Sequence, residues 1–376
     1  MKKSRKKVGR KTVRIAALTA VISAIAVIAV ALLFAGFIRS RKTAEEAQVP
    51  DPEQTEEPIE KPTEEPGQSD TSETGEEVIV YPAPGYNFKT DEIVVEIEGL
   101  EREYTIAFIN DIHMITDHSS GDVTEDNMAT VRERYETLSV TEEGIPAEEL
   151  WPEIIKFLNY NDFDAVIFAG DILDYCSNSN IVALQAGLSE LKYPDDRIMY
   201  IRSDHDYGGW YGGSGFTDSN GFLLQSFVLD ADRPEKLIEF EDFMIVGINQ
   251  SYRNLSEQSY DLIDHNLNQG KPVLIATHVP FYSDVDDSLE ELSMEVRNKI
   301  YYWSDNGVNY VPAGQTRALI DSMYAEDSNV VQIVAAHMHA SWDGYVTDRL
   351  KEHIFAPSFQ GNIGIIRVIR SAENEE

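Results

Sequence analysis

The chain has 376 residues and a formal net charge of −35, and 42% of its residues are hydrophobic and 26% charged. This composition excludes a chain that is disordered throughout. The excess of acidic residues argues against a general affinity for nucleic acid, whose phosphates require Lys and Arg. Cys176 is the only cysteine, which excludes an intramolecular disulfide.

A basic tip and an apolar run open the chain. Residues 1–14 carry eight Lys or Arg residues and no acid, and residues 15–38 carry no charge. A helix of about 24 residues is about 36 Å long, enough to cross a hydrocarbon core of about 30 Å. A cleaved signal peptide is the alternative, but its apolar region is typically shorter, about 7–15 residues, and ends in small residues. We therefore predict an uncleaved transmembrane helix over residues 15–38. The cation bias predicts a single-pass cell-membrane protein with a cytoplasmic N-terminus and an extracytoplasmic body.

Residues 39–77 form a polar segment. Beyond its first few residues it is rich in Glu, Pro, Thr and Ser and almost free of aliphatic side chains. Such a segment cannot bury enough apolar surface to offset its chain entropy. We expect an extended, disordered stalk that connects the membrane helix to a folded domain over residues 78–371.

Short apolar runs in the folded domain end abruptly at polar residues, as buried strands do. Five such runs cover residues 104–110, 164–169, 197–201, 271–276 and 330–335. Apolar residues at spacings of three and four predict helices over residues 151–159, 179–191, 256–268 and 315–324. Strands that alternate with helices predict an α/β layer architecture.

Asp and His residues follow all five predicted strands. They are Asp111 and His113, Asp171 and Asp174, Asp204 and His205, His278, and His337 and His339. Ligands of open α/β sheets collect beyond the carboxyl ends of the strands. Oxygen and imidazole donors suit Mn, Fe, Zn or Ni, and a thiolate cluster is excluded by the single cysteine. The pattern therefore predicts a site for divalent transition-metal ions.

In these residues the chain resembles the calcineurin-like metallophosphoesterases, as a membrane-anchored bacterial-type member. The family has the blocks D-x-H, G-D-x-x-D, G-N-H-[D/E], a lone His and G-H-x-H, each after a strand. All five blocks occur here in that order between about residues 104 and 340, and residues 354–369 resemble the closing strands of the family. The resemblance implies an α/β fold: a four-layer α/β/β/α sandwich of two mixed sheets with a dinuclear metal site at the strand ends.

The resemblance also implies a role for each residue of the blocks. The first metal would be held by Asp111, His113, Asp171 and His339. The second metal would share Asp171 and would also be held by Asp204, His278 and His337. His205 would be the general acid that protonates the leaving oxygen, and Asp174 would orient and charge His205.

Three positions depart from the family pattern. Asp204 stands where the family usually has Asn, and it adds a negative charge to the second site. Ser203 and Ala336 stand where the family has Gly, so a turn that requires positive φ would be strained or rearranged there. The Arg-Gly pair of the family's Ser/Thr protein phosphatases is missing after Asp174, which argues against that activity.

A segment rich in Gly follows the His205 block and carries Trp210, Tyr211 and Phe216. Their flat apolar faces suit a lid that stacks on a base or a sugar ring of the substrate. A flexible surface loop with its own small aromatic cluster is an equal alternative.

The sequence as a whole predicts metal-dependent hydrolysis of a small phosphomonoester or phosphodiester by a water that two divalent metal ions activate, at the outer face of the membrane. Two alternatives stay open. One is a nucleotide or nucleotide-sugar pyrophosphatase. The other is a catalytically weakened, membrane-tethered binding module, in which case Ser203 and Asp204 would have reduced turnover.

Overall fold

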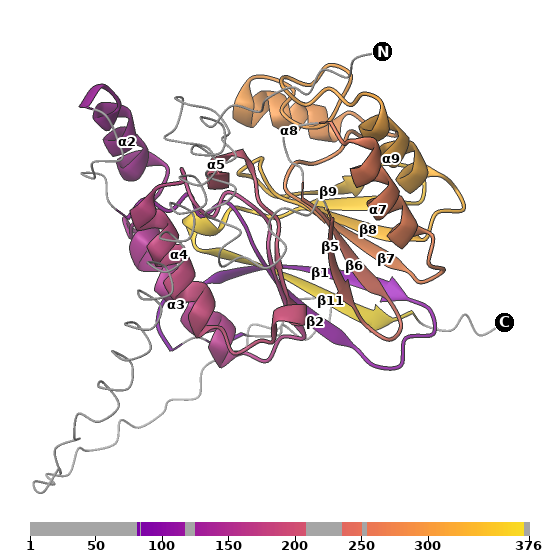
Figure 1. The fold of residues 1–376 in the computed structure, drawn as a ribbon, viewed down its shortest axis with the longest axis horizontal. Coiled ribbons are helices and arrows are strands. Elements are labelled where there is room, and N and C mark those ends of the chain that lie inside the picture. Colours follow the sequence, from indigo (N-terminus) through magenta and orange to yellow (C-terminus); the bar gives the residue numbers. More distant parts are fainter. Residues whose placement is uncertain (1–80, 83, 117–124, 208–234, 250–253, 372–376) are drawn as a thin grey trace, which may run out of the picture. The chain divides into compact units, whose positions relative to one another are not determined.

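The computed structural model describes residues 81–82, 84–116, 125–207, 235–249 and 254–371 (Figure 1). The chain divides into two compact units, Met1–Glu76 and Glu77–Glu376, and all described residues belong to the second. The predicted basic tip, membrane helix and stalk lie outside the described residues. None of the helices in the described part of the chain is long and apolar enough to cross a membrane.

The first sheet has five strands in the order β1-β11-β2-β3-β4. They are β1 (Lys89–Ile97), β2 (Tyr104–Ile109), β3 (Ala165–Phe168), β4 (Ile198–Tyr200) and β11 (Asn362–Arg370). The sheet is mixed, because β11 pairs antiparallel to β2 while all other neighbours are parallel.

The second sheet has six strands in the order β5-β6-β7-β8-β10-β9. They are β5 (Glu235–Glu239), β6 (Met244–Ile248), β7 (Val273–Thr277), β8 (Val330–Ala335), β9 (Trp342–Tyr345) and β10 (Lys351–Ile354). It is mixed as well, because the edge strands β5 and β9 run antiparallel to their neighbours.

The two sheets pack face to face, and alternating side chains of each strand explain why. Ile106 and Phe108 of β2 join one buried cluster with Leu274 and Ala276 of β7. The intervening residues of these strands point to the opposite faces, where they pack against helices. Strands that are buried on both faces read as continuous apolar runs, which is the pattern of the sequence. The prediction of an α/β fold with two mixed sheets is confirmed.

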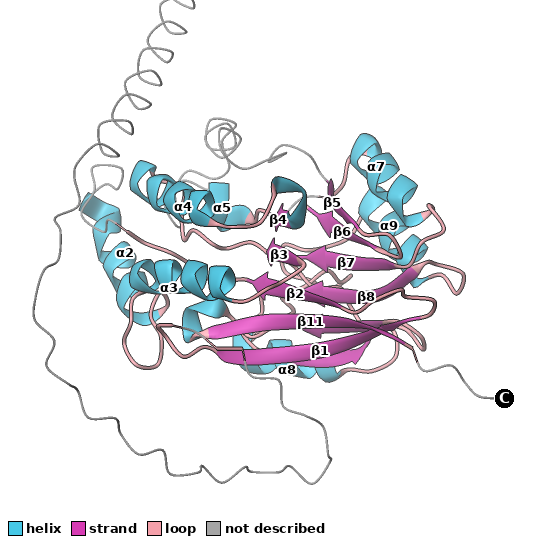
Figure 2. Ribbon diagram, turned by 90° about the horizontal axis from the view of Figure 1, so that it is seen from below, coloured by secondary structure: helices cyan, strands magenta, loops and turns pink. Residues whose placement is uncertain are grey.

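Helices cover the outer face of each sheet (Figure 2). On the first sheet they are α3 (Ala147–Tyr160) and α4 (Asn178–Glu190), and on the second α7 (Glu257–Leu267) and α9 (Gln315–Tyr324). All four were predicted from their apolar spacing. Helix α4 approaches α3 closely at Gly187, where a Cβ atom would lie 2.3 Å from Nε1 of Trp151.

Three helices were not predicted. They are α2 (Glu125–Thr137), α5 (Asp204–Tyr207) and α8 (Ser288–Arg297). Helix α2 has the polar sequence EDNMATVRERYET, which lacks a clear apolar stripe. Helix α8 does have one, since Leu289, Leu292 and Val296 recur at spacings of three and four. Both helices contribute an arginine to the site described next.

Candidate metal centre

The candidate ligands lie directly beyond the ends of the predicted strands, in an unusual backbone conformation. Seven non-glycine residues of the described chain have positive φ, and five of them are candidate ligands: Asp111, His113, Asp171, His337 and His339. Left-handed conformations cost L-residues free energy and cluster at functional sites. The backbone therefore turns sharply at the first, second and fifth blocks, and in the first and fifth blocks this brings side chains two positions apart into one site.

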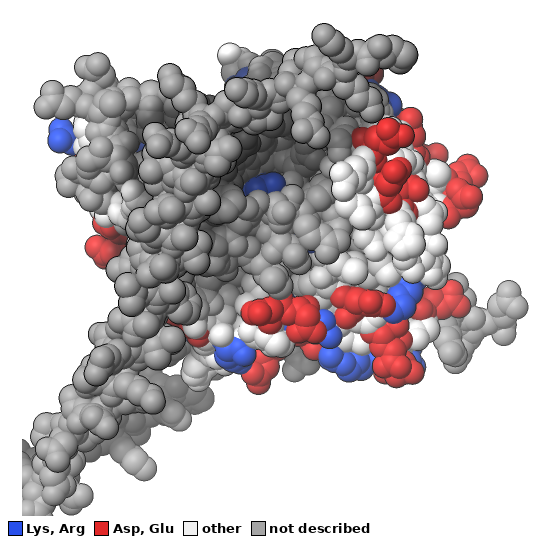
Figure 3. Space-filling view, in the orientation of Figure 1, with Lys and Arg blue, Asp and Glu red and all other residues white. Residues whose placement is uncertain are grey.

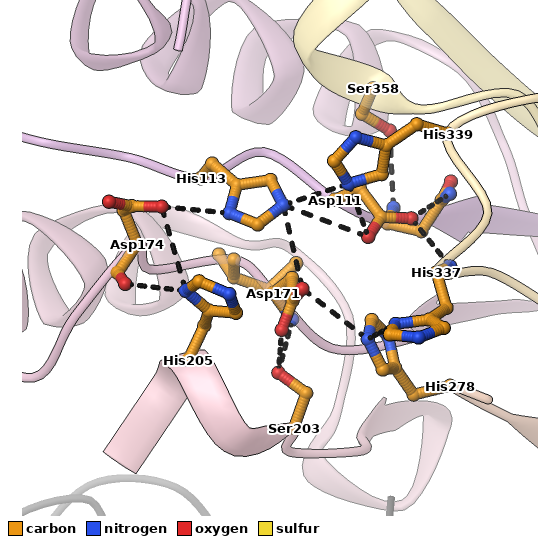
Figure 4. Close-up of polar contacts among 12 residues, drawn as sticks. Asp111, His113, Asp171, Asp174, Ser203, His205, His278, His337, His339 and Ser358 are labelled. Carbon is orange, nitrogen blue, oxygen red and sulfur yellow. Dashed lines mark hydrogen bonds and ion pairs between the residues drawn. The ribbon is translucent and has the colours of Figure 1, made fainter. Parts of the chain in front are cut away.

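The first ligand group gathers residues from three strand ends (Figure 4). One donor atom each from Asp111, His113, Asp171 and His339 lies within 4.8 Å of the others. Nε2 of His113 is 3.0 Å from Nε2 of His339, and Oδ1 of Asp111 is 3.5 Å from the same His339 nitrogen. This is the set that the family resemblance implies for the first metal.

The second ligand group contains Asp171, His278 and His337. Nε2 of His278 lies 3.2 Å from Nδ1 of His337 and 3.4 Å from Oδ2 of Asp171. The same Oδ2 of Asp171 is 3.5 Å from Nε2 of His113, which belongs to the first group. One carboxylate oxygen is thus shared by both groups.

The carboxylates of Asp111 and Asp171 are each held through one oxygen, and the other oxygen faces the imidazoles. Oδ2 of Asp111 accepts hydrogen bonds from the Asn110 amide and the His337 backbone N–H, at 2.8 and 2.9 Å. Oδ1 of Asp171 accepts a hydrogen bond from the hydroxyl of Ser203. Oδ1 of Asp111, which faces the imidazoles of the first group, is buried and has no hydrogen-bond partner among the described residues. A buried polar atom without a partner is costly, and a cation would satisfy it.

Two imidazoles are oriented through their second nitrogen. Nδ1 of His278 donates to the carbonyl oxygen of Ala169 at 2.8 Å, and Nδ1 of His113 lies 3.0 Å from Oδ1 of Asp174. Metal-binding histidines commonly donate their other N–H to a carbonyl or a carboxylate, which fixes the tautomer and the ring. The residues present therefore fit two divalent cations with oxygen and imidazole ligands.

The electrostatics keep His337, His339 and Asp171 in their metal-binding forms, whereas His278 is protonated at neutral pH and must lose that proton to bind a cation. Burial lowers the pKa of His337 well below its usual range and that of His339 to about 4, so both rings are neutral at neutral pH. Burial would lower the pKa of His278 as well, but the Asp171 carboxylate raises it to about 10. Burial would raise the pKa of Asp171, yet His278 and its neighbours hold it well below the usual range, so Asp171 is ionised. Ionised carboxylates beside these rings favour a bound cation.

His205 and Asp174 lie beside the first ligand group, with contacts that differ from the expected ones. Nδ1 of His205 donates to the backbone carbonyl of Asp174 at 2.7 Å, whereas its distance to Oδ1 of the carboxylate is 3.6 Å. The carboxylate instead contacts His113 and forms an ion pair with Arg134 of α2, whose Nε lies 2.8 Å from Oδ2. The main chain of Asp174 orients His205, and its side chain orients His113.

The three positions that depart from the family pattern are accommodated without a strained turn. Neither Ser203 nor Ala336 has positive φ, so of the two expected outcomes, a strained or a rearranged turn, the structure shows the rearranged one. The Ser203 hydroxyl also accepts a hydrogen bond from the backbone N–H of Asp171 at 2.8 Å. Asp204 lines the same cavity as the ligands, but it belongs to neither ligand group among the described residues.

A cavity of about 160 Å³ opens beside the two ligand groups. Its lining residues are His113, Arg134, Leu138, Asp171, Asp204, His205, Arg297, Tyr301, His337 and His339. Arg134, Arg297 and Tyr301 could not be predicted from the sequence pattern, because none belongs to a block. The apolar stripe of α8 was a signal for the helix that ends at Arg297. The predicted aromatic residues Trp210, Tyr211 and Phe216 lie outside the described residues.

A match to one protein family agrees with this geometry. Residues 104–341 match the calcineurin-like phosphoesterase family. Comparison with curated proteins gave no match.

Similar solved structures include three hydrolases. One is a dimetal phosphatase from Danio rerio, with a TM-score of 0.44, 11% identity, and coverage of 69% of this chain and 89% of that one. A purple acid phosphatase from yellow lupin, Lupinus luteus, has a TM-score of 0.39 and 13% identity, and the match covers 72% of this chain and 45% of that one. A phosphopantetheinyl hydrolase from Mycobacterium tuberculosis has a TM-score of 0.36 and 10% identity, and the match covers 69% of this chain and 92% of that one.

The family match covers more than half of the chain and includes all five blocks of Asp and His residues. The family depends on dinuclear metal centres, and the described residues contain two ligand groups that share a carboxylate. The chain therefore belongs to the calcineurin-like phosphoesterases and is a metal-dependent hydrolase of phosphoric esters.

Proposed function

We propose that this protein hydrolyses a small phosphomonoester or phosphodiester with a water that two divalent cations activate. The observation that carries the proposal is the position of Oδ2 of Asp171, 3.5 Å from His113 in one ligand group and 3.4 Å from His278 in the other. A carboxylate shared in this way is the bridge that a two-metal site requires. When bound, the two cations lower the pKa of a water and polarise the phosphoryl oxygens.

The chain's own residues supply ligation and a proton. Asp111, His113, Asp171 and His339 would hold one cation, and Asp171, His278 and His337 the other. Asp204 lines the cavity beside the second group and would complete it as a further oxygen ligand. Its pKa is raised by burial and by the neighbouring charge of Asp171, which a cation would relieve.

His205 would protonate the leaving oxygen. Its Nδ1–H donates a hydrogen bond to the backbone carbonyl oxygen of Asp174, so Nε2 is the nitrogen available to the substrate. Burial lowers the pKa of His205, but the surrounding carboxylates, above all Asp171, outweigh this effect. The pKa of His205 is therefore raised above its usual value. The imidazole therefore keeps the proton that an alkoxide leaving group needs.

The test is metal analysis of full-length protein purified without chelator, followed by assays on chromogenic mono- and diesters and on nucleotide-sugar pyrophosphates with added Mn. We expect two metal ions per chain and hydrolysis of at least one ester class. Full activity after complete removal of metal would contradict the proposal. Hydrolysis of pyrophosphates alone would favour the pyrophosphatase alternative, and metal binding without turnover would favour the binding module.

We also propose that the catalytic body lies outside the cytoplasmic membrane, held by the uncharged run over residues 15–38. A protease added to intact cells should then release a fragment that begins within residues 39–77. Protection of that fragment, or release of the protein into the medium by signal peptidase, would contradict this topology.

The surface charge supports a small-molecule substrate rather than nucleic acid. On the face shown in Figure 3, acidic side chains predominate over Lys and Arg among the described residues, and nucleic-acid phosphates would be repelled by them.

A further inference from the structure

Arg297 lies in the cavity wall, but it neither ligates a cation nor supplies a proton in the proposed reaction. Arg297 is the last residue of α8, and its side chain lines the cavity together with Tyr301 and the ligands His337 and His339. The chain therefore places a permanent positive charge beside the two ligand groups.

The guanidinium of Arg297 is held in place from two sides. Its Nη2 donates to the backbone carbonyl of His337 at 2.7 Å. Its Cζ lies 5.7 Å from the ring centre of Tyr301, and that ring stacks on the imidazole of His337 at 4.4 Å. Because the group is anchored to a ligand residue, its remaining N–H donors have a fixed direction.

Within the described part of the chain, the bond from Nη2 to His337 is the one hydrogen bond that Arg297 forms. Nε is buried and makes no hydrogen bond, and no carboxylate among the described residues forms an ion pair with this side chain. Other arginines differ: Arg134 pairs with Asp174, and Arg317 pairs with Asp305. A buried donor of a charged group is costly when it has no acceptor, so an anionic ligand in the cavity would satisfy it.

We propose that Arg297 binds a terminal phosphate oxygen of the substrate and makes the site prefer phosphomonoesters to phosphodiesters. This inference rests on the proposed function of the site. A monoester phosphate carries up to two negative charges and three terminal oxygens, whereas a diester carries one charge and two terminal oxygens. A planar guanidinium recognises phosphate through parallel N–H donors, so the doubly charged group gains more from it.

The size of the cavity agrees with this ligand. Its volume of about 160 Å³ is below the roughly 300–1,000 Å³ of pockets that enclose drug-sized ligands. The part of the site formed by these lining residues therefore suits the phosphate group, while the rest of the ester would extend beyond it.

The experiment compares Arg297→Gln with Arg317→Gln in the full-length, metal-loaded protein. Arg317 is a matched control, since it is an arginine of α9 that bonds Tyr282 and Asp305 and does not line the cavity. The first measurement is the binding of inorganic phosphate by calorimetry. Loss of a charge-assisted hydrogen bond should weaken phosphate binding about 10- to 100-fold in Arg297→Gln and leave the control unchanged. The second is the ratio of kcat/KM for a monoester to that for a diester of the same alcohol, which should fall only in Arg297→Gln.

Two further measurements keep the test decisive. Metal content and thermal unfolding of each variant show whether the contact with His337 was needed for folding. If Arg297→Gln does not fold, Arg297→Lys replaces it. A lysine keeps the positive charge but lacks the parallel N–H donors of the guanidinium. Its phosphate affinity should therefore be lower than that of the wild type, by less than the loss expected for Arg297→Gln.

The outcomes separate the inference from the proposed function. A folded Arg297→Gln variant could bind phosphate as tightly as the wild type and show the same ratio of monoester to diester kcat/KM. That result would overturn the role of Arg297, even if hydrolysis is metal-dependent. If the wild type binds phosphate through Arg297 but hydrolyses no ester, the proposed function fails and the anion site stands.

Discussion

Oδ1 of Asp174 lies 3.0 Å from Nδ1 of His113. A carboxylate that holds the second nitrogen of a ligating histidine commonly contributes 10- to 100-fold to metal affinity. We therefore expect Asp174→Asn to weaken the binding of one of the two metal ions by about that factor. Competition of each variant against a fluorescent chelator measures the loss. Asp162→Asn is the control, because Asp162 is almost fully exposed and, among the described residues, forms an ion pair only with Lys192. Metal affinity equal to that of the wild type would show that Asp174 acts on His205 alone.

Replacement of Asp171 by Asn should be the most damaging change of a single ligand. Its carboxylate is shared by both ligand groups, so the variant should bind neither cation tightly. Because ligation stabilises the folded state by mass action, metal should raise the melting temperature of the wild type but barely that of the variant. Melting curves with and without Mn test this. A variant that loses only one of two metal ions would contradict a bridging role.

The His205→Ala variant should lose activity selectively. Nitrophenolate leaves without a proton, whereas an alkoxide needs one, and general acid catalysis typically contributes about 10²–10⁴-fold. We expect a loss in that range for alkyl phosphoesters and a much smaller loss for nitrophenyl esters. Steady-state kcat on both ester types gives the comparison. Equal losses would mean that His205 positions the substrate rather than donating a proton.

Glu352, which belongs to neither ligand group, should make the stability of the fold depend on pH. Its fully buried carboxyl accepts hydrogen bonds from the backbone N–H of Phe281 at 3.2 and 3.3 Å, and burial raises its pKa well above the usual range. The folded state therefore keeps a proton that the unfolded state loses above about pH 4.5. Wild-type stability should fall as pH rises from there toward the folded pKa, by up to about 1.4 kcal/mol per pH unit.

Glu352→Gln should remove this dependence, because an amide oxygen still accepts the Phe281 N–H and carries no proton to lose. Urea unfolding at pH 4 and pH 7 should show the variant gaining stability over the wild type at the higher pH only. Glu290→Gln, at an exposed position of α8, is the control. A difference between variant and wild type that is the same at both pH values would mean that Glu352 is ionised in the folded protein.

The sequence could place the candidate ligands near one another because each block follows a buried strand. In a layered α/β fold the strand ends converge, so Asp111, Asp171 and His337 had to meet once their strands shared two facing sheets. The order of the blocks carried the family resemblance and with it the pairing of ligands into two groups.

Contacts made by residues outside the blocks could not be predicted. Arg134 reaches Asp174 from α2, whose polar sequence lacks the periodicity that identifies a packed helix. Asp174 follows Asp171 by three residues, but this spacing does not determine whether the carboxylate or the backbone carbonyl of Asp174 faces His205. The sequence left open whether the turn at Ser203 is strained or rearranged; it is rearranged, because the serine hydroxyl forms hydrogen bonds with Asp171 and the residue has no positive φ.

The pairing of β1 with β11 determines when the domain can fold. β1 lies at the edge of the first sheet and pairs in parallel with β11 along its full length, from Lys89 opposite Asn362 to Ile97 opposite Arg370. A chain emerging from the ribosome exposes β1 first and β11 last, so nearly the whole domain must be synthesised before this edge can close. Contacts of such high sequence separation form slowly, and unpaired strands are prone to aggregate. A nascent chain of this protein should therefore depend on chaperones until its last strand is released, and a truncation before Asn362 should leave β1 without a partner.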